Sequence, residues 1–126
     1  MAKHQELTQH LQELRQAIPE LSDLLLASSE GSPIAHSLSN GTDPNSVASM
    51  AAASSLGRRI SDSMNTGTVC DISIQGEKGA IFFYSAGSRA VLAVICPKDS
   101  NTRLIHLEAS ATVKKISDLF QRKENP

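Results

Sequence analysis

Two uninterrupted apolar runs in the second half of the chain constrain its fold most. Residues 80–84 read AIFFY and residues 90–96 read AVLAVIC, with the turn sequence SAGS between them and Pro97 after them. Short apolar runs that are bounded by turn residues predict strands buried on both faces. Such strands belong to a sheet that is covered by helices on both sides.

The segment before these runs alternates between apolar and polar residues. Cys70, Ile72 and Ile74 share one face of residues 69–75. The other face carries Val69, Asp71, Ser73 and Gln75. A period of two is typical of a half-buried strand, so this strand is expected toward an edge of the sheet. Residues 69–97 therefore predict an antiparallel meander of three strands.

The remaining segments supply two further strands and three helices. Leu7, Leu11, Leu14 and Ile18 recur at helical spacing before Pro19, and a similar spacing returns after the polar residues 98–101. Asp43 followed by Pro44 is typical of a helix start. The predicted ranges are a helix at 4–18, a strand hairpin at 21–28 and 33–38, a loop at 39–42, a helix from 44 to about 65 or 67, and a last helix before a frayed tail at 121–126. The sequence thus predicts a single α/β sandwich domain over residues 1–126.

Composition limits the classes of partner. The chain has 12 basic and 13 acidic residues and a net charge of -1, so it has no basic footprint for nucleic acid or an anionic membrane. No segment approaches the roughly 20 apolar residues of a membrane span, and the start lacks the apolar stretch of a secretory signal. We therefore expect a cytoplasmic protein. Cys70 and Cys96 are expected to be reduced core residues, since a strand separates them.

The central helix has two unlike faces when its residues are placed at about 100° intervals. One face is apolar and is expected to lie on the sheet: Met50, Ala53, Leu56, Gly57, Ile60 and Met64. The opposite face is a patch of small residues: Ala48, Ala51, Ala52 and Ser55. These alanines either raise helix propensity or permit another helix to approach closely. The charged residues Arg58, Arg59 and Asp62 follow the small patch.

The sequence predicts no catalytic residue, cofactor or metal site. It contains neither of the glycine-rich phosphate-binding motifs. Its four histidines are scattered and are expected at the surface, and its serines lack a nucleophile-elbow context. Arg58 and Arg59 have two interpretations, a solvated helix face or a guanidinium that stabilises a phosphoryl transition state. The solvated face is the preferred interpretation.

Three segments, in this order and spacing, resemble the roadblock/dynein light chain family. LSDLLLASSEGSPIAHS is similar to the first hairpin of the family, SVASMAAASSLGRRI to its alanine-rich central helix, and GAIFFYSAGSRAVLAVIC to its closing strands. The resemblance extends from about residue 18 to 119. It implies a profilin-like three-layer sandwich with a five-stranded antiparallel sheet and helices on both faces. It also implies a homodimer formed through the central helix and the adjacent edge strand.

The resemblance assigns roles to the residues described above. Ala48, Ala51, Ala52 and Ser55 would pack against their symmetry mates, and Val69, Asp71, Ser73 and Gln75 would lie in an edge strand that pairs with its copy. Arg58, Arg59 and Asp62 would contact a partner on the platform made by the paired helices.

Three functions follow from these expectations. The first is a non-catalytic homodimeric regulator that binds a small Ras-like GTPase and modulates its GTP hydrolysis. The second is a structural adaptor that scaffolds a motor or signalling complex without affecting nucleotide turnover. The third is a small-ligand sensor, which requires a sizeable internal pocket that the packed strands disfavour.

Overall fold

The computed structural model describes residues 2–36 and 44–124. Within these ranges the chain forms helices and strands in the predicted order. The elements are α1 (Ala2–Ala17), β1 (Asp23–Ser28), β2 (Pro33–His36), α2 (Pro44–Ser63), β3 (Ile72–Gln75), β4 (Gly79–Ala86), β5 (Ala90–Pro97) and α3 (Thr102–Glu124).

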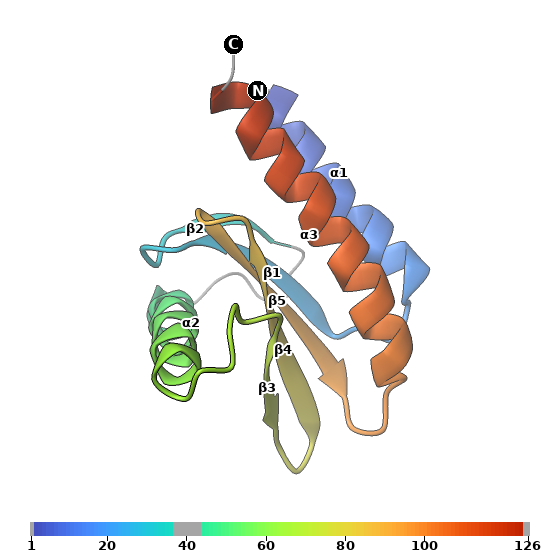
Figure 1. Cartoon of the computed structure of the whole chain (residues 1–126). Helices are drawn as coiled ribbons and strands as arrows, with labels where there is room; N and C mark the ends of the chain where they lie inside the picture. The colour runs from blue at the N-terminus through green and yellow to red at the C-terminus, as the bar shows by residue number, and fades with distance from the viewer. Residues whose placement is uncertain (1, 37–43, 125–126) are drawn as a thin grey trace.

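The strands form one five-stranded sheet in the order β2-β1-β5-β4-β3 (Figure 1). All four strand pairs are antiparallel, and the meander from β3 to β5 pairs Ile72 with Phe83 and Phe82 with Val94. The two edges of the sheet are β2 and β3. The prediction that the alternating strand lies at an edge is therefore confirmed.

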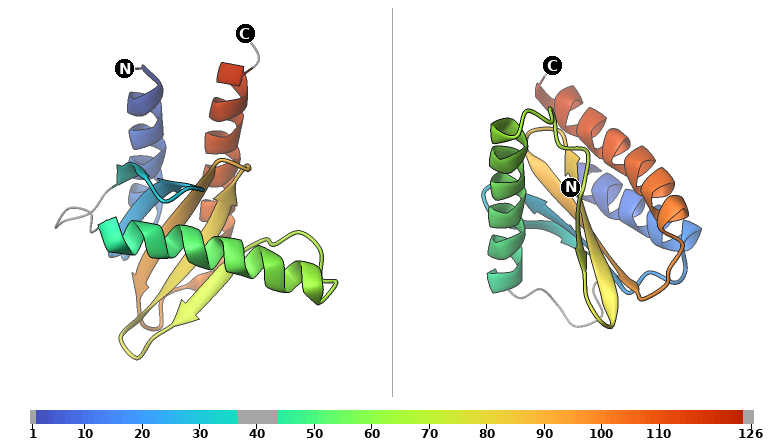
Figure 2. Two further views of the ribbon diagram at one scale, coloured as in Figure 1. Left: turned by 90° about the vertical axis from the view of Figure 1, so that its left-hand side faces the viewer. Right: turned by 60° about the horizontal axis from the view of Figure 1, so that its bottom comes forward.

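Helices cover both faces of the sheet, as predicted. Helices α1 and α3 lie side by side on one face, and α2 crosses the other (Figures 1 and 2). The core on the side of α1 and α3 includes the predicted stripe of Leu7, Leu11, Leu14 and Ile18. The smaller core under α2 is built from β1, β4 and β5 together with Val47 and Met50 of α2. Apolar side chains on both faces explain why β4 and β5 read as continuous apolar runs.

Several element ends differ from the expected ones. β3 begins at Ile72, so Val69, Cys70 and Asp71 precede the strand, and Cys70 is exposed rather than buried in the core. α2 ends at Ser63, and α3 continues to Glu124, which places residues 121–124 in the helix. The expected loop at 39–42 and the cap at Asp43 lie outside the described residues. None of the helices in the described ranges is sufficiently long and apolar to span a membrane.

Candidate protein-interaction surface

α2 contacts the sheet through a narrow stripe. Val47, Met50 and Ser54 are buried and recur at intervals of three and four residues, as expected for one face of a helix. The hydroxyl of Ser54 is not left unpaired by its burial, because Arg58 Nη1 donates to Ser54 Oγ at 3.3 Å. The contacts of α2 with the sheet are mainly on β1 and β5.

Gly57 continues this stripe to the edge strand. A Cβ atom at residue 57 would lie 2.5 Å from Ile72 Cδ1 and 3.3 Å from Ile72 Cγ1. Any side chain at this position would therefore force Ile72 to move. Because Gly57 has no side chain, the second half of α2 can approach β3 closely.

The apolar face predicted for α2 is wrong at three positions. Leu56, Ile60 and Met64 were expected on the sheet, but they are 53%, 50% and 70% exposed. Because the buried stripe runs through Val47, Met50, Ser54 and Gly57, these three side chains lie on the flank of the helix. The last turns of α2 also extend past the edge of the sheet, where no strand lies beneath them (Figure 2, left).

A groove of about 490 Å³ opens between the first half of α2 and the sheet. Ser49, Met50 and Ala53 line it from the helix. Its other wall is apolar and is made by Leu25, Ile74, Ile81, Phe83, Ala93 and Ile95. Ile74 is 48% exposed on β3, so the apolar surface continues from the groove to the edge of the sheet.

The small residues predicted to form a dimer interface are divided between two environments. A Cβ atom at Gly31, in the turn between β1 and β2, would lie 3.4 Å from Ala48 Cα and 3.7 Å from Ala51 Cβ. The φ angle of Gly31 is +96°, a value that favours glycine. Because residue 31 has no Cβ atom, this turn can approach α2 closely. Ala51 is half-buried, whereas Ala48, Ala52 and Ser55 are exposed. Their role in an interface between copies stays a prediction.

The residues predicted for the paired edge strand lie in and before β3. Ser73 and Gln75 are exposed within the strand. Asp71 is exposed and Val69 is half-buried, and both precede the strand. One side of β3 pairs with β4, and the other is an edge of the sheet. This edge is geometrically able to accept another strand.

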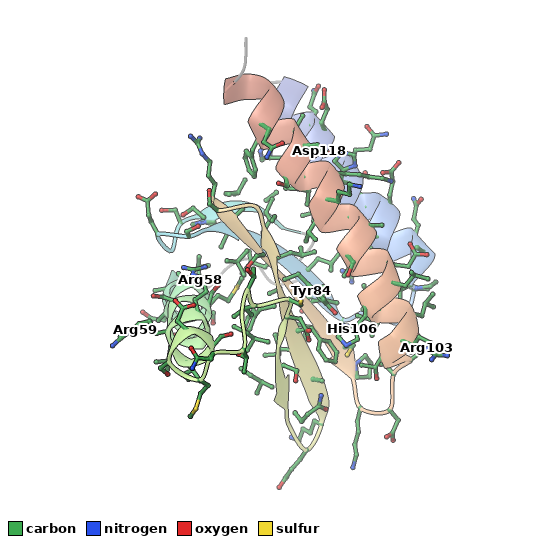
Figure 3. The ribbon with its side chains drawn as sticks, viewed as in Figure 1. Arg58, Arg59, Tyr84, Arg103, His106 and Asp118 are labelled. Atoms are coloured by element: carbon green, nitrogen blue, oxygen red, sulfur yellow. The ribbon has the colours of Figure 1, made fainter. Side chains whose placement is uncertain are left out.

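The charged residues of α2 are exposed. Arg58, Arg59 and Asp62 all reach solvent, and Figure 3 shows Arg59 pointing away from the sheet. These predicted contact residues are therefore accessible, although Arg58 also bonds to the buried Ser54 of its own helix.

One titratable pair lies on the opposite side of the sheet. Tyr84 OH on β4 and His106 Nδ1 on α3 are 2.5 Å apart, and the two side chains point toward each other (Figure 3). Burial, reinforced by the negative charges of Asp71 and Cys96, raises the pKa of Tyr84 above its ordinary value of 10.0. His106 is half-buried and also contacts Phe82 edge to face, so it is not the surface histidine that the sequence predicts. The pair ties α3 to the sheet.

No group of His, Cys, Asp and Glu side chains within the described ranges is placed to hold a metal ion. The surface features of the described residues are instead those of a protein-binding face: an exposed apolar flank, an apolar groove and an edge strand.

Comparison with known proteins agrees with this arrangement. The family model described as Roadblock/LC7 domain matches residues 7–96. The chain belongs to the Roadblock/LC7 domain family. The matched region extends from α1 to the end of β5, so it begins earlier and ends earlier than the predicted resemblance. Among curated proteins, none matches this chain significantly by sequence.

Several solved structures share the fold of this chain. A structure described as MglB with tetrameric arrangement has a TM-score of 0.85 and 13% identity, covering 97% of this chain and 93% of that one. The Roadblock/LC7 domain from Streptomyces avermitilis gives a TM-score of 0.80 at 23% identity, with coverages of 90% and 97%. Profilin from Schizosaccharomyces pombe gives a TM-score of 0.66 at 15% identity, with coverages of 89% and 97%. These similarities confirm the profilin-like sandwich.

Sequence reasoning missed the most exposed part of this Roadblock/LC7 surface. Leu56, Ile60 and Met64 were assigned to the core because they are apolar and recur at helical spacing. A second stripe on the same helix begins with the apolar residues Val47 and Met50 and continues through Ser54 and Gly57, which are not apolar, so only its first half carries a sequence signal. Two such stripes on one helix indicate two contact surfaces.

Proposed function

We propose that this chain is a non-catalytic, homodimeric regulator that binds a small Ras-like GTPase and modulates its GTP hydrolysis. The observation that carries the proposal is the exposed apolar flank of α2 beside the edge strand β3, in a chain of the Roadblock/LC7 family. Large apolar side chains gathered on one exposed face are typical of a protein-binding site. Pairing of β3 with its copy would also cover a strand edge that otherwise favours aggregation.

The regulator acts by presenting a surface. Two copies joined at α2 and β3 form one platform, and Arg58, Arg59 and Asp62, which follow the small patch along the same helix, contact the GTPase. Guanidinium groups are suited to this role because each presents several donors in a fixed plane. Arg58 is already bonded to Ser54 of its own helix, which supports a docking role over insertion into a nucleotide site. The platform orders the catalytic residues of the GTPase itself.

The experiment combines binding with turnover. Ras-like GTPases from the same organism are loaded with GDP or with a non-hydrolysable GTP analogue, and their affinity for this protein is measured by calorimetry. GTP hydrolysis is then followed with and without the protein. Nucleotide-dependent binding with a changed rate supports the regulator. Binding without a change in rate contradicts regulation and favours the structural adaptor, and no binding contradicts both.

A further inference from the structure

Two serines of this chain follow a pair of basic residues at the same spacing. Residues 58–61 read RRIS and residues 114–117 read KKIS, so each serine has cations two and three positions before it. Serine/threonine kinases that select substrates by charge bind such cations with carboxylates of their substrate groove. The sequence pattern alone does not separate the two segments, but their surroundings in the structure do.

The RRIS segment lies at the exposed end of α2. It belongs to the last turns of the helix, which extend past the edge of the sheet (Figure 2, left). Arg58 and Arg59 are exposed, and Ile60, directly before the serine, is 50% exposed. Ser61 is half-buried, and its hydroxyl donates to Gly67 O at 2.5 Å. Gly67 is itself exposed in the turn after the helix, so a kinase that displaces this turn reaches the hydroxyl.

The KKIS segment is enclosed by the core. It lies inside α3, and Ile116, directly before the serine, is 0% exposed. Ser117 faces the turn between β4 and β5, where a Cβ atom at Gly87 would lie 2.9 Å from Ser117 Oγ. A kinase would therefore have to pull α3 off the sheet to bind this segment. The structure thus makes one of the two serines accessible and encloses the other.

We propose that Ser61 is a phosphorylation site for an arginine-selective serine/threonine kinase. In the reaction, Ser61 Oγ attacks the γ-phosphorus of ATP, and the bond from that phosphorus to the bridging oxygen of the leaving ADP breaks. The hydroxyl proton passes to the catalytic carboxylate of the kinase. Arg58 and Arg59 hold the segment in the kinase, because a guanidinium can bond to a carboxylate through two N–H groups at once.

The end of α2 has the features of a segment that unwinds locally. Gly57 directly precedes the segment, and glycine is a weak helix former. Beyond it, the side chains of Ile60 and Met64 are 50% and 70% exposed, so unwinding these turns disrupts little buried apolar surface. The hydrogen bond from Arg58 to Ser54 is exchanged for bonds to the kinase. The hydroxyl of Ser61 can therefore reach ATP while the rest of the fold stays intact.

A phosphate on Ser61 would change the end of α2. It adds about -1.5 to -2 charges at neutral pH, beside Asp62 and near the helix C-terminus, where the helix dipole disfavours negative charge. It also removes the donor to Gly67 O, which releases the turn after the helix. Arg58, three residues earlier, lies within reach of the phosphate. If Arg58 contacts a GTPase, phosphorylation weakens that contact; this consequence rests on the proposed function, whereas the site itself does not.

The test compares the folded protein with an unfolded reference. The protein and a synthetic peptide of residues 55–66 are incubated separately with ATP, Mg²⁺ and a purified arginine-selective serine/threonine kinase. Mass spectrometry of proteolytic fragments locates the phosphate. We expect phosphate on Ser61 in both, at rates within about 100-fold of each other because the local opening costs little. Ser117 should carry none, and Ser61→Ala should remove the modification.

A matched control separates accessibility from the kind of cation. Lys114→Arg combined with Lys115→Arg converts the second segment into RRIS. Ser117 should stay unmodified in this variant, because the residue before it is buried in the core. Arg58→Ala combined with Arg59→Ala should lower the rate at Ser61 at least about tenfold, since charged hydrogen bonds to the kinase are lost.

The outcomes decide the proposal without a GTPase. Phosphate on the peptide but not on the folded protein overturns it, and so does the absence of phosphate on both. Equal modification of Ser61 and Ser117 in the arginine variant overturns the structural argument. Because no GTPase takes part, failure of this test leaves the proposed function standing, and failure of GTPase binding leaves the phosphorylation site standing.

Discussion

Gly57 of α2 lies directly over Ile72 of β3, so close that a Cβ atom on the glycine would come within 2.5 Å of Ile72 Cδ1. This contact sets the height of α2 above the sheet edge. Because Gly57 faces the edge strand, Leu56 and Ile60 lie on the flank of the helix, where they are exposed. One missing side chain therefore connects the packing of the fold to the surface that we propose for the dimer.

The first prediction concerns the size of the residue at position 57. In Gly57→Ala, the higher helix propensity of alanine adds about 1 kcal/mol of stability. The displacement of Ile72 from its rotamer costs a similar amount. The free energy of unfolding should therefore change by less than about 1 kcal/mol. Gly57→Leu should lower it by about 1–3 kcal/mol through overpacking. Urea denaturation measures both. Ile72→Ala in the Gly57→Leu background should recover part of the loss, and equal stability of Gly57→Leu and wild type would contradict the close approach.

The second prediction is a loss of stability at alkaline pH. The folded state holds the phenol proton of Tyr84 more tightly than the unfolded state, because burial raises its pKa above 10.0. Below pH 10 both the folded and the unfolded state keep this proton, so the full contribution of Tyr84 to the free energy of unfolding is present. Above pH 10 the unfolded state loses its proton first, so the free energy of unfolding falls as pH rises. Tyr84→Phe should flatten this dependence and cost about 1 kcal/mol at neutral pH.

Tyr84 can be followed directly because the chain contains one tyrosine and no tryptophan. Ionisation of a phenol changes the near-ultraviolet absorbance, so a spectroscopic pH titration of this protein reports Tyr84 alone. The midpoint should lie well above 10 in the folded protein and near 10 in denaturant. A midpoint near 10 under both conditions would show that Tyr84 is not buried against His106.

The third prediction concerns the start of α3. Asn101 Oδ1 accepts a hydrogen bond from the backbone N–H of Leu104 at 3.1 Å, which is the geometry of a helix N-cap. Asn101→Ala should therefore lower the free energy of unfolding by about 1 kcal/mol. Asn101→Asp keeps an acceptor at the cap and should remain within a few tenths of wild type. If both variants lost the same free energy of unfolding, the hydrogen bond at the N-cap would not be the cause of the loss.

The fourth prediction separates the two interpretations of the arginines. Changing Arg58 and Arg59 together to Ala should weaken GTPase binding about tenfold and leave the dimer mass unchanged. Changing both to Lys keeps the charges, so most of the binding and of the rate effect should remain. An arginine that entered the nucleotide site would behave differently, since such a residue contributes about 10³–10⁵ in rate. A collapse of turnover in the Lys pair with binding intact would therefore support an arginine finger.

Local patterns predicted the architecture because each strand of the meander carries its own signal. The apolar runs of β4 and β5 and the alternation at Ile72 and Ile74 determine which strands are central and which lies at an edge. The apolar stripe of α1 likewise predicted a helix that covers one face of the sheet, because its helical spacing is a local signal. The strand order, with β1 between β2 and β5, is a long-range property that these local patterns do not carry.

The candidate surface was less predictable because exposure depends on what lies beneath a residue. Leu56, Ile60 and Met64 have the spacing of a core stripe, but the last turns of α2 extend past the sheet, so the same spacing lies on an open flank. Ser54 and Gly57 have no apolar signal, yet Ser54 is buried and Gly57 closely approaches Ile72 of β3. Cys70 was assigned to the core on residue type, whereas β3 begins two residues later.

The most direct test of the account is the rate of GTP hydrolysis by a Ras-like GTPase at increasing concentrations of this protein. Wild type and Ile60→Glu, which places a carboxylate in the exposed apolar flank of α2, are compared in parallel. The account predicts a saturable change in rate with the wild-type dimer and little or none with Ile60→Glu. An unchanged rate for every GTPase of the same organism, at concentrations where the wild-type protein is dimeric, would contradict it.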